Sequence, residues 1–171
     1  MSQLTQPSTS QEHSQDQLTR DQLLQELQVS QRQVVRLLEA MADVQDWQPE
    51  PVEWSFRLIA AHLATVEKSC HLRRVMKIAS GETPHFDHYF NVGANFAGVD
   101  LRDSLRRWES TRRQLIAFVR DLSESQLTFV GFHETVGPMT VLDALQEMLD
   151  QDQGNLRHVR QLIVAYHEEA Q

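Results

Sequence analysis

The chain has 171 residues, of which 40% are hydrophobic and 23% charged, and these ordinary values predict one globular domain. Its formal net charge of −8 argues against nucleic acid as a partner, because neutralising phosphates requires concentrated Lys and Arg. No apolar run approaches the roughly 20 residues of a membrane-spanning helix. The N-terminus lacks the basic start and apolar core of a secretory signal. We therefore expect a soluble, cytoplasmic protein that binds neither nucleic acid nor membrane.

The first 17 residues are rich in Gln, Ser and Thr, a composition that is typical of a disordered lead-in. We place the single domain at residues 18–171. Its one cysteine, Cys70, has no second cysteine with which to form an internal disulfide, and it falls within a helical pattern. Cys70 is therefore expected to be a small core or interface residue.

Two helices are predicted in the first half of the domain. Apolar residues recur at three- and four-residue steps between residues 18 and 44, and Thr19 and Gln22 supply a capping box at the start. Pro49 and Pro51 then break the helical pattern. The second helix is expected to begin near Ser55 and to end near "SGETP" at residues 80–84.

Two more helices are predicted in the second half. Asp100 is a suitable cap for a helix that ends near Ser123, and Thr140 with Asp143 opens the last one. The segments at residues 85–100 and 123–138 lack a sustained period and are expected to be loops. Four amphipathic helices bury their apolar stripes best against one another, so we predict an all-α four-helix bundle.

Two helices carry clusters of basic residues. Because polar residues are interleaved with these clusters, both are expected to be solvated helix faces. The alternative is an anionic small-molecule pocket. The basic residues are Arg73, Arg74 and Lys77 on the second helix and Arg102, Arg106, Arg107, Arg112 and Arg113 on the third.

Helical position distinguishes the eight histidines. His62 shares its face with apolar residues of the second helix, and His158 lies at the edge of the apolar stripe of the last helix. Imidazoles on two facing helices are how a bundle builds half of a metal site. The alternative is that both are hydrogen-bonded histidines at the edge of the core.

A third ligand would favour the metal site, because zinc- and nickel-type sites generally use three protein donors. The natural place is one turn before His158, but that position holds Gly154. Asp150 and Asp152 are the candidates for a replacement ligand on the same helix, and Asp152 in particular faces inward and needs a partner. His133, just before the last helix, is a further candidate.

The remaining histidines give weaker signals. His85 and His88 form a short cluster on the first predicted loop, which surface histidines often do by chance. His71 is expected to be exposed on its helix. Loop position alone suggests a set of residues at the mouth of a pocket, namely Trp54, His85, His88, Phe96 and His133.

Two stretches, "WSFRLIAAHLATVE" and "FHETVGPMTVLDAL…HVRQLI", resemble the second helix and the last loop and helix of the DinB/YfiT-like superfamily. The resemblance covers the chain from about residue 18 onward. It implies an up-down-down-up four-helix bundle, often a homodimer. It also implies a divalent metal such as nickel or zinc, held by one histidine on the second helix and an H-x-x-x-H pair on the last.

His62 and His158, with Gln161 after it, match this pattern, and Gly154 stands where the remaining ligand would be. The better-understood members are thiol-dependent transferases and isomerases, and many others are regarded as metal-dependent hydrolases. Two hypotheses follow. The chain is a DinB-like protein with an inter-helix pocket for a small molecule or thiol and an incomplete metal site. Alternatively, it is a non-catalytic oligomeric helical protein that binds a small metabolite or a protein partner, in which Gly154 allows close helix or subunit contact.

Overall fold

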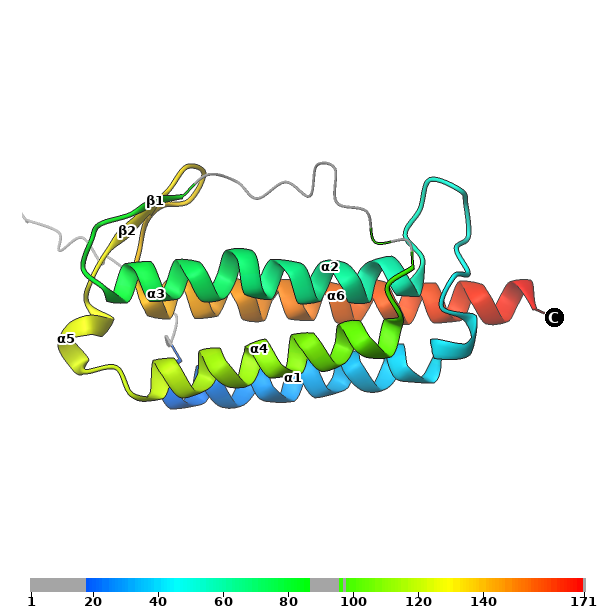
Figure 1. Cartoon of the computed structure of the whole chain (residues 1–171), viewed down its shortest axis with the longest axis horizontal. Coiled ribbons are helices and arrows are strands. Elements are labelled where there is room, and N and C mark those ends of the chain that lie inside the picture. The colour runs from blue at the N-terminus through cyan, green and yellow to red at the C-terminus, as the bar shows by residue number, and fades with distance from the viewer. Residues whose placement is uncertain (1–17, 87–95, 97, 171) are drawn as a thin grey trace, which may run out of the picture.

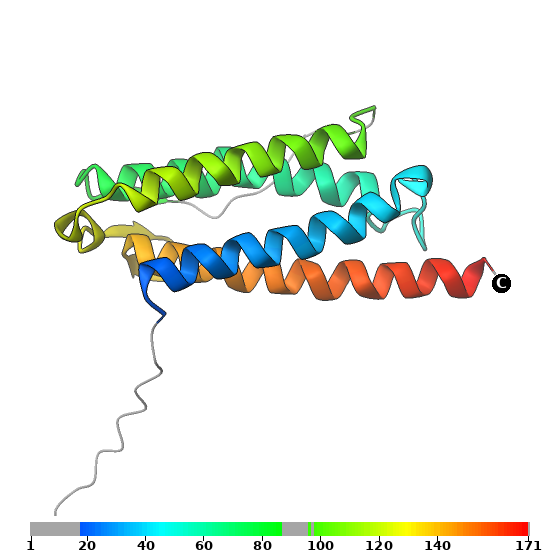
Figure 2. The same ribbon diagram turned by 90° about the horizontal axis from the view of Figure 1, so that it is seen from below.

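The protein folds as a bundle of four long helical segments, as Figures 1 and 2 show for a computed structural model that describes residues 18–86, 96 and 98–170. The segments are α1 (Arg20–Ala40), α2 (Phe56–Val66) with its continuation, α4 (Leu101–Arg120) and α6 (Val141–Glu169). The continuation of α2 consists of a π-helical segment, η2 (Glu67–Leu72), and α3 (Arg73–Ala79). A short 3₁₀ turn, η1 (Ala42–Val44), follows α1. The predicted helical bundle is confirmed.

The helix starts follow the capping residues in the sequence. Thr19 and Thr140 each form a capping box with the residue three positions on, which confirms both predictions. The Asp100 side chain accepts hydrogen bonds from the backbone N–H groups of Arg102 and Asp103, and Ser55 caps α2. Local hydrogen-bonding chemistry therefore sets where each long helix begins.

The π-helical segment η2 was not predicted. It lies between α2 and α3, so the second predicted helix is continuous but contains wider turns in its middle. A π-segment rotates the residues after it relative to a regular α-helix, and such segments are frequent at functional sites. Here η2 places both Glu67 and His71 on the buried side.

The second predicted loop, at residues 123–138, contains regular structure, which corrects that prediction. A short helix, α5 (Glu124–Leu127), is followed by the strands β2 (Gly131–His133) and β3 (Gly137–Met139). β2 pairs antiparallel with β3 and parallel with β1 (His85–Phe86), and this small sheet lies at one end of the bundle near α3. Of the first predicted loop, the segments 87–95 and 97 lie outside the described residues.

Gly131 allows the small sheet to lie close to the bundle, because it has no side chain. A Cβ atom at this position would lie 2.9 Å from Ile78 Cγ1 and 3.0 Å from a ring carbon of Phe86. Any side chain there would therefore push β2 away from α3. The strand brings its last residue, His133, into a buried position beside the helices.

Two apolar clusters fill the two ends of the bundle, and a polar layer separates them. One cluster joins Leu23, Leu24 and Leu27 of α1 to the first half of α6, and the other joins Val34, Val35 and Leu38 to the second half. Between them, each long segment contributes polar residues to the interior. We call these the central polar layer: Ser30, Glu67, Arg112 and Asp152.

Within the described residues, no helix has both the length and the apolar character needed to cross a bilayer.

Candidate functional site

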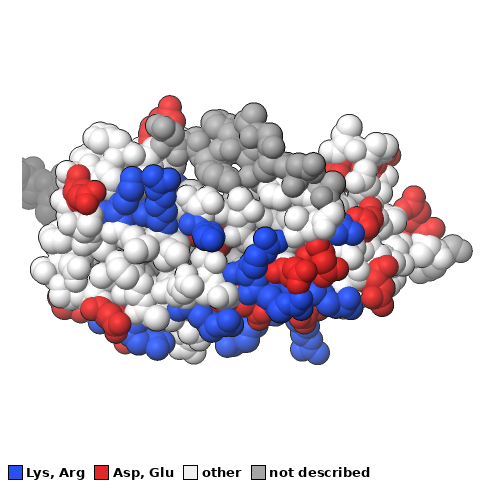
Figure 3. All heavy atoms as spheres, in the orientation of Figure 1, with Lys and Arg blue, Asp and Glu red and all other residues white. Residues whose placement is uncertain are grey.

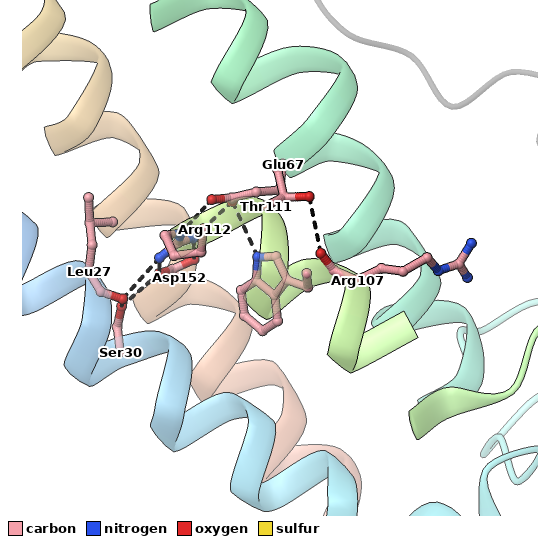
Figure 4. Close-up of polar contacts among 8 residues, drawn as sticks. Leu27, Ser30, Glu67, Arg107, Thr111, Arg112 and Asp152 are labelled. Atoms are coloured by element: carbon pink, nitrogen blue, oxygen red, sulfur yellow. Dashed lines mark hydrogen bonds and ion pairs between the residues drawn. The ribbon is translucent and has the colours of Figure 1, made fainter. Parts of the chain in front are cut away.

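The central polar layer is organised by Arg112 (Figure 4). Its Nη1 donates to Asp152 Oδ2 and to the Leu27 carbonyl, both at 2.9 Å, and its Nη2 donates to Glu67 Oε2 at 2.9 Å. Nη2 also donates to Asp152 Oδ1, and Nε donates to Glu67 Oε1. All five N–H donors of the guanidinium are therefore used.

The two carboxylates of this layer are also held by neutral donors. Ser30 Oγ donates to Asp152 Oδ2 at 2.6 Å, and Trp108 Nε1 donates to Glu67 Oε2 at 3.2 Å. Burial lowers the pKa of Arg112, but the adjacent Glu67 and Asp152 carboxylates outweigh it and raise the pKa overall. The expectation that Arg112 lies on a solvated face is wrong, because the side chain is buried in this network. The inward Asp152 has its partner here.

A first cavity lies between the segment α2–η2–α3 and α6, beside the central polar layer. Its volume is about 350 Å³. His133 on β2 also lines it, so the small sheet forms part of its wall. The lining residues are His62, Val66, Cys70, His71, Arg74, His133, Glu147, Gln151, Gly154 and Asn155.

A second cavity, of about 590 Å³, adjoins the first along His62 and Asn155, which line both. Trp54, Ile59 and His158 also line it. The structure thus brings His62 and His158 to one cavity. His158 nevertheless remains exposed to solvent.

His62 is half-buried, and its ring lies 4.7 Å from that of Trp54 in an edge-to-face arrangement. Burial lowers the pKa of His62 below its ordinary value of 6.5. The imidazole is therefore neutral at pH 7, the state in which it can accept a hydrogen bond or act as a ligand.

Gly154 lines the first cavity without filling any of it with a side chain. A Cβ atom at this position would have Arg157 Nη2 as its nearest neighbour, at 3.8 Å, which is ordinary van der Waals contact. Close packing between helices of this chain therefore does not require the glycine. The position offers space for a side chain but supplies no donor.

The three candidate replacement ligands are each held by other groups. His133 Nδ1 accepts hydrogen bonds from the backbone N–H groups of Thr135 at 3.2 Å and Val136 at 3.3 Å. This places the proton on Nε2, whereas a histidine that binds metal through Nε2 carries its proton on Nδ1. Asp150 is exposed and accepts from Gln146 Nε2, and Asp152 belongs to the central polar layer.

His71, which the sequence placed on the surface, is buried, and that prediction is wrong. Its pKa is lowered to about 3, chiefly by burial and also by the nearby cations Arg74 and Arg112, against opposing effects of Asp152 and of the hydrogen bond with Gln151. His71 therefore remains neutral throughout the physiological range. It lies between the central polar layer and the first cavity.

Arg74 is likewise buried and not part of a solvated face. Its Nη1 donates to Glu147 Oε2 at 2.7 Å, its Nη2 donates to Cys70 Sγ at 3.3 Å, and its guanidinium lies 5.7 Å from the centre of the Phe86 ring. Glu67, His71 and Arg74 follow one another at steps of four and three residues. The same helical period that marked the apolar stripe could therefore have identified all three as inward-facing.

The residues of the first and second cavities do not fit a tightly held divalent metal. Among the described residues, no group of three His, Cys, Asp or Glu side chains could hold a metal ion. His62 and His158 supply two donors, Gly154 supplies none, and the Arg74 cation lines the first cavity. Three protein donors are the general requirement for such a site.

Of the residues proposed for a pocket mouth, Trp54 lines the second cavity and His133 the first. His85 is exposed on β1, where its ring stacks on Phe132 with 5.4 Å between ring centres. Phe96 is half-buried, and it is not among the described residues that line the first or the second cavity. His88 lies outside the described residues.

Comparison with known proteins relates this geometry to one family. The sequence model of the DinB superfamily matches residues 26–159. YfiT from Bacillus subtilis, described as a probable metal-dependent hydrolase with an unusual four-helix bundle topology, has a similar structure with a TM-score of 0.72. The two are 21% identical, over 92% of this chain and 91% of that one, so the likeness concerns the fold. No functionally curated protein matches the sequence.

Proposed function

This chain belongs to the DinB superfamily, and we propose that it binds a small polar molecule in the first cavity without a resident divalent metal ion. The observation that carries the proposal is Gly154, which leaves open space at a ligand position of the family pattern. Loss of one of three donors weakens metal binding strongly, because affinity depends on the number and geometry of the ligands. The cavity itself remains.

The lining of the first cavity supports a polar ligand. Arg74 offers a buried positive charge beside Glu147, while Gln151 and Asn155 offer amide groups. A few convergent polar groups in a concave site are the usual means of orienting a small molecule. We infer that the ligand is recognised by hydrogen bonds to these groups.

Cys70 argues against thiolate chemistry from the chain itself. Burial raises the pKa of its thiol, and Glu147 raises it as well, with the nearby Arg74 acting in the opposite direction. A protonated thiol is a poor nucleophile. In the proposed function, Cys70 is a neutral part of the cavity wall.

The first test is the metal content of the untagged protein after gel filtration without chelator. We expect well under one equivalent of nickel, zinc or a similar ion per chain. About one equivalent would overturn the proposal. That result would mean that another group supplies the missing metal ligand. It would favour the alternative function, metal-dependent hydrolysis or thiol transfer.

A gain-of-function variant sharpens this test. Gly154→His restores the third donor at a position where a side chain has room, so we expect it to bind one divalent ion tightly, measured by titration calorimetry with Zn²⁺ and Ni²⁺. Gly154→Gln is the matched control, since it adds similar bulk without an imidazole. If both variants bind metal no better than the natural chain, His62 and His158 do not form part of a metal site.

Two further features of the family pattern are proposed for this chain. The colours of Figure 1 support an up-down-down-up order, because α1 and α6 begin at the left end and α2 and α4 at the right. The homodimer is also a proposal, tested by light scattering on the gel-filtration peak. A monomer at micromolar concentration would contradict it.

A further inference from the structure

A third cavity lies on another face of the bundle, between α1 and α4, which Figure 2 shows side by side. Its volume is about 400 Å³, within the range of small-molecule sites. It has no lining residue in common with the first and second cavities. The lining residues that carry the argument are Gln31, Arg32, Glu109, Arg112, Arg113 and Arg120.

The charge of this cavity is opposite to that of the whole chain. The chain has a formal net charge of −8, yet the cavity is lined by four arginines and a single carboxylate, Glu109. In Figure 3, several Lys and Arg side chains lie along the lower part of the molecule, where Figure 1 places α4 and α1, with Asp and Glu side chains between them. A local excess of guanidinium groups on an acidic protein favours an anionic ligand.

The four arginines have different roles. Arg112 is buried and all five of its N–H donors are used within the central polar layer, so it has none left for a ligand. Arg32, Arg113 and Arg120 are exposed, and among the described residues none of their side chains makes a hydrogen bond or an ion pair. Their donors are available.

Gln31 is a second, independent sign of a ligand. Its side chain lines the cavity and is only 7% exposed, and its Nε2 is buried without a hydrogen-bond partner in the described part of the chain. A buried donor without an acceptor costs about 1–3 kcal/mol. A rotation of the amide toward the cavity would bring Nε2 to an oxygen atom bound there, which would offer the missing acceptor.

The helical spacing explains why these groups converge. Arg113 and Arg120 are seven residues apart on α4, which places them two turns apart on one face. Gln31 and Arg32 are neighbours on α1, so the amide faces the interior while the arginine reaches the rim. The cavity therefore has cations around its opening and a neutral donor in its wall.

We propose that the cavity between α1 and α4 binds the phosphate group of a small molecule. Guanidinium groups match the oxygens of phosphate and form charge-assisted hydrogen bonds with them. The volume leaves room for more than the phosphate group itself. Glu109 is the one opposing charge, and it would exclude ligands that crowd negative charge on its side of the cavity.

The test is calorimetric titration of the full chain with inorganic phosphate and with pyrophosphate, at an ionic strength held constant with chloride. We expect saturable binding at one site per chain, with pyrophosphate bound at least fivefold more tightly than phosphate. Arg113→Gln should weaken this binding at least tenfold. A natural chain that shows no binding beyond chloride would overturn the proposal.

The matched control is Arg36→Gln, which removes the same charge from an exposed position on α1 that does not line the cavity. We expect less than a twofold change in affinity for this variant. If Arg36→Gln weakens binding as much as Arg113→Gln, the binding depends only on the overall charge of the protein, and the proposal fails. Gln31→Leu should reduce the affinity at least threefold without destabilising the ligand-free protein, because it removes an unpartnered buried amide.

Discussion

The central polar layer and the first cavity lie side by side, and both include residues of two segments, η2 and α6. In the layer, Arg112 meets two carboxylates and every one of its donors is used. In the cavity, His62 and Arg74 line about 350 Å³ of space, and Gly154 contributes no side chain. In the layer, ion pairs and hydrogen bonds join the helices to one another. In the cavity, polar side chains line an open space.

This difference separates polar residues with a structural role from those available for binding. A buried charge that is fully compensated is costly to disturb, because removing one partner leaves the other unpaired in the interior. Polar groups on a cavity wall can change with little effect on the fold. Substitutions in the layer should therefore lower the free energy of unfolding, whereas substitutions on the cavity wall should mainly change ligand binding.

The largest effect is expected for Arg112→Met. This variant leaves Glu67 and Asp152 buried without their cation, at a cost of about 3–5 kcal/mol in the free energy of unfolding. Urea unfolding at pH 7 measures it. The control is Arg113→Met, which changes the same kind of residue at the next, exposed position and should stay within about 0.5 kcal/mol. A loss below about 1 kcal/mol for Arg112→Met would mean that the layer is not the compensated network described above.

The second effect is a pH dependence carried by His71, which faces Arg74, Arg112, Asp152 and Gln151. Its pKa is lowered from 6.5 to about 3 in the folded chain. Below pH 6.5 the unfolded chain binds a proton that the folded chain does not, so the free energy of unfolding falls as the pH drops from 6.5 toward 3. One group contributes a slope of up to about 1.4 kcal/mol per pH unit.

Unfolding of the natural chain and of His71→Asn between pH 7.5 and 5 isolates this contribution. The variant should lose the extra slope below pH 6.5, whatever its stability at neutral pH. His167→Asn, at an exposed position near the end of α6, is the matched control and should keep the slope. Parallel curves for the natural chain and His71→Asn would contradict a buried neutral His71.

The smallest effect compares two glycines. Gly154→Ala adds a Cβ atom that meets only Arg157 Nη2 at 3.8 Å, and replacing a glycine inside a helix should raise the free energy of unfolding by up to about 1 kcal/mol. Gly131→Ala should instead destabilise, because its Cβ would lie 2.9 Å from Ile78 Cγ1. Thermal unfolding measures both changes: the melting temperature should rise for Gly154→Ala and fall for Gly131→Ala. If Gly154→Ala also destabilises, the glycine has a packing role, such as a subunit contact.

Much of the fold was predictable from local patterns. The capping boxes at Thr19 and Thr140 and the cap at Asp100 mark helix starts, because the bonds they form involve residues within a few positions. The regular spacing of apolar residues indicated the four long helices. The two short strands β2 and β3 were missed, because segments of three residues have too little periodicity to be recognised.

The candidate site was only partly predictable. The sequence by itself determined that Gly154 lies one turn before His158 and that one donor is missing from the family pattern. Only the tertiary structure decided that Arg112 is buried, since its partners Glu67 and Asp152 lie 45 and 40 positions away in the chain. Helical period says which way a side chain points, but a charge is stable in the interior only if other helices bring its counter-charges to it.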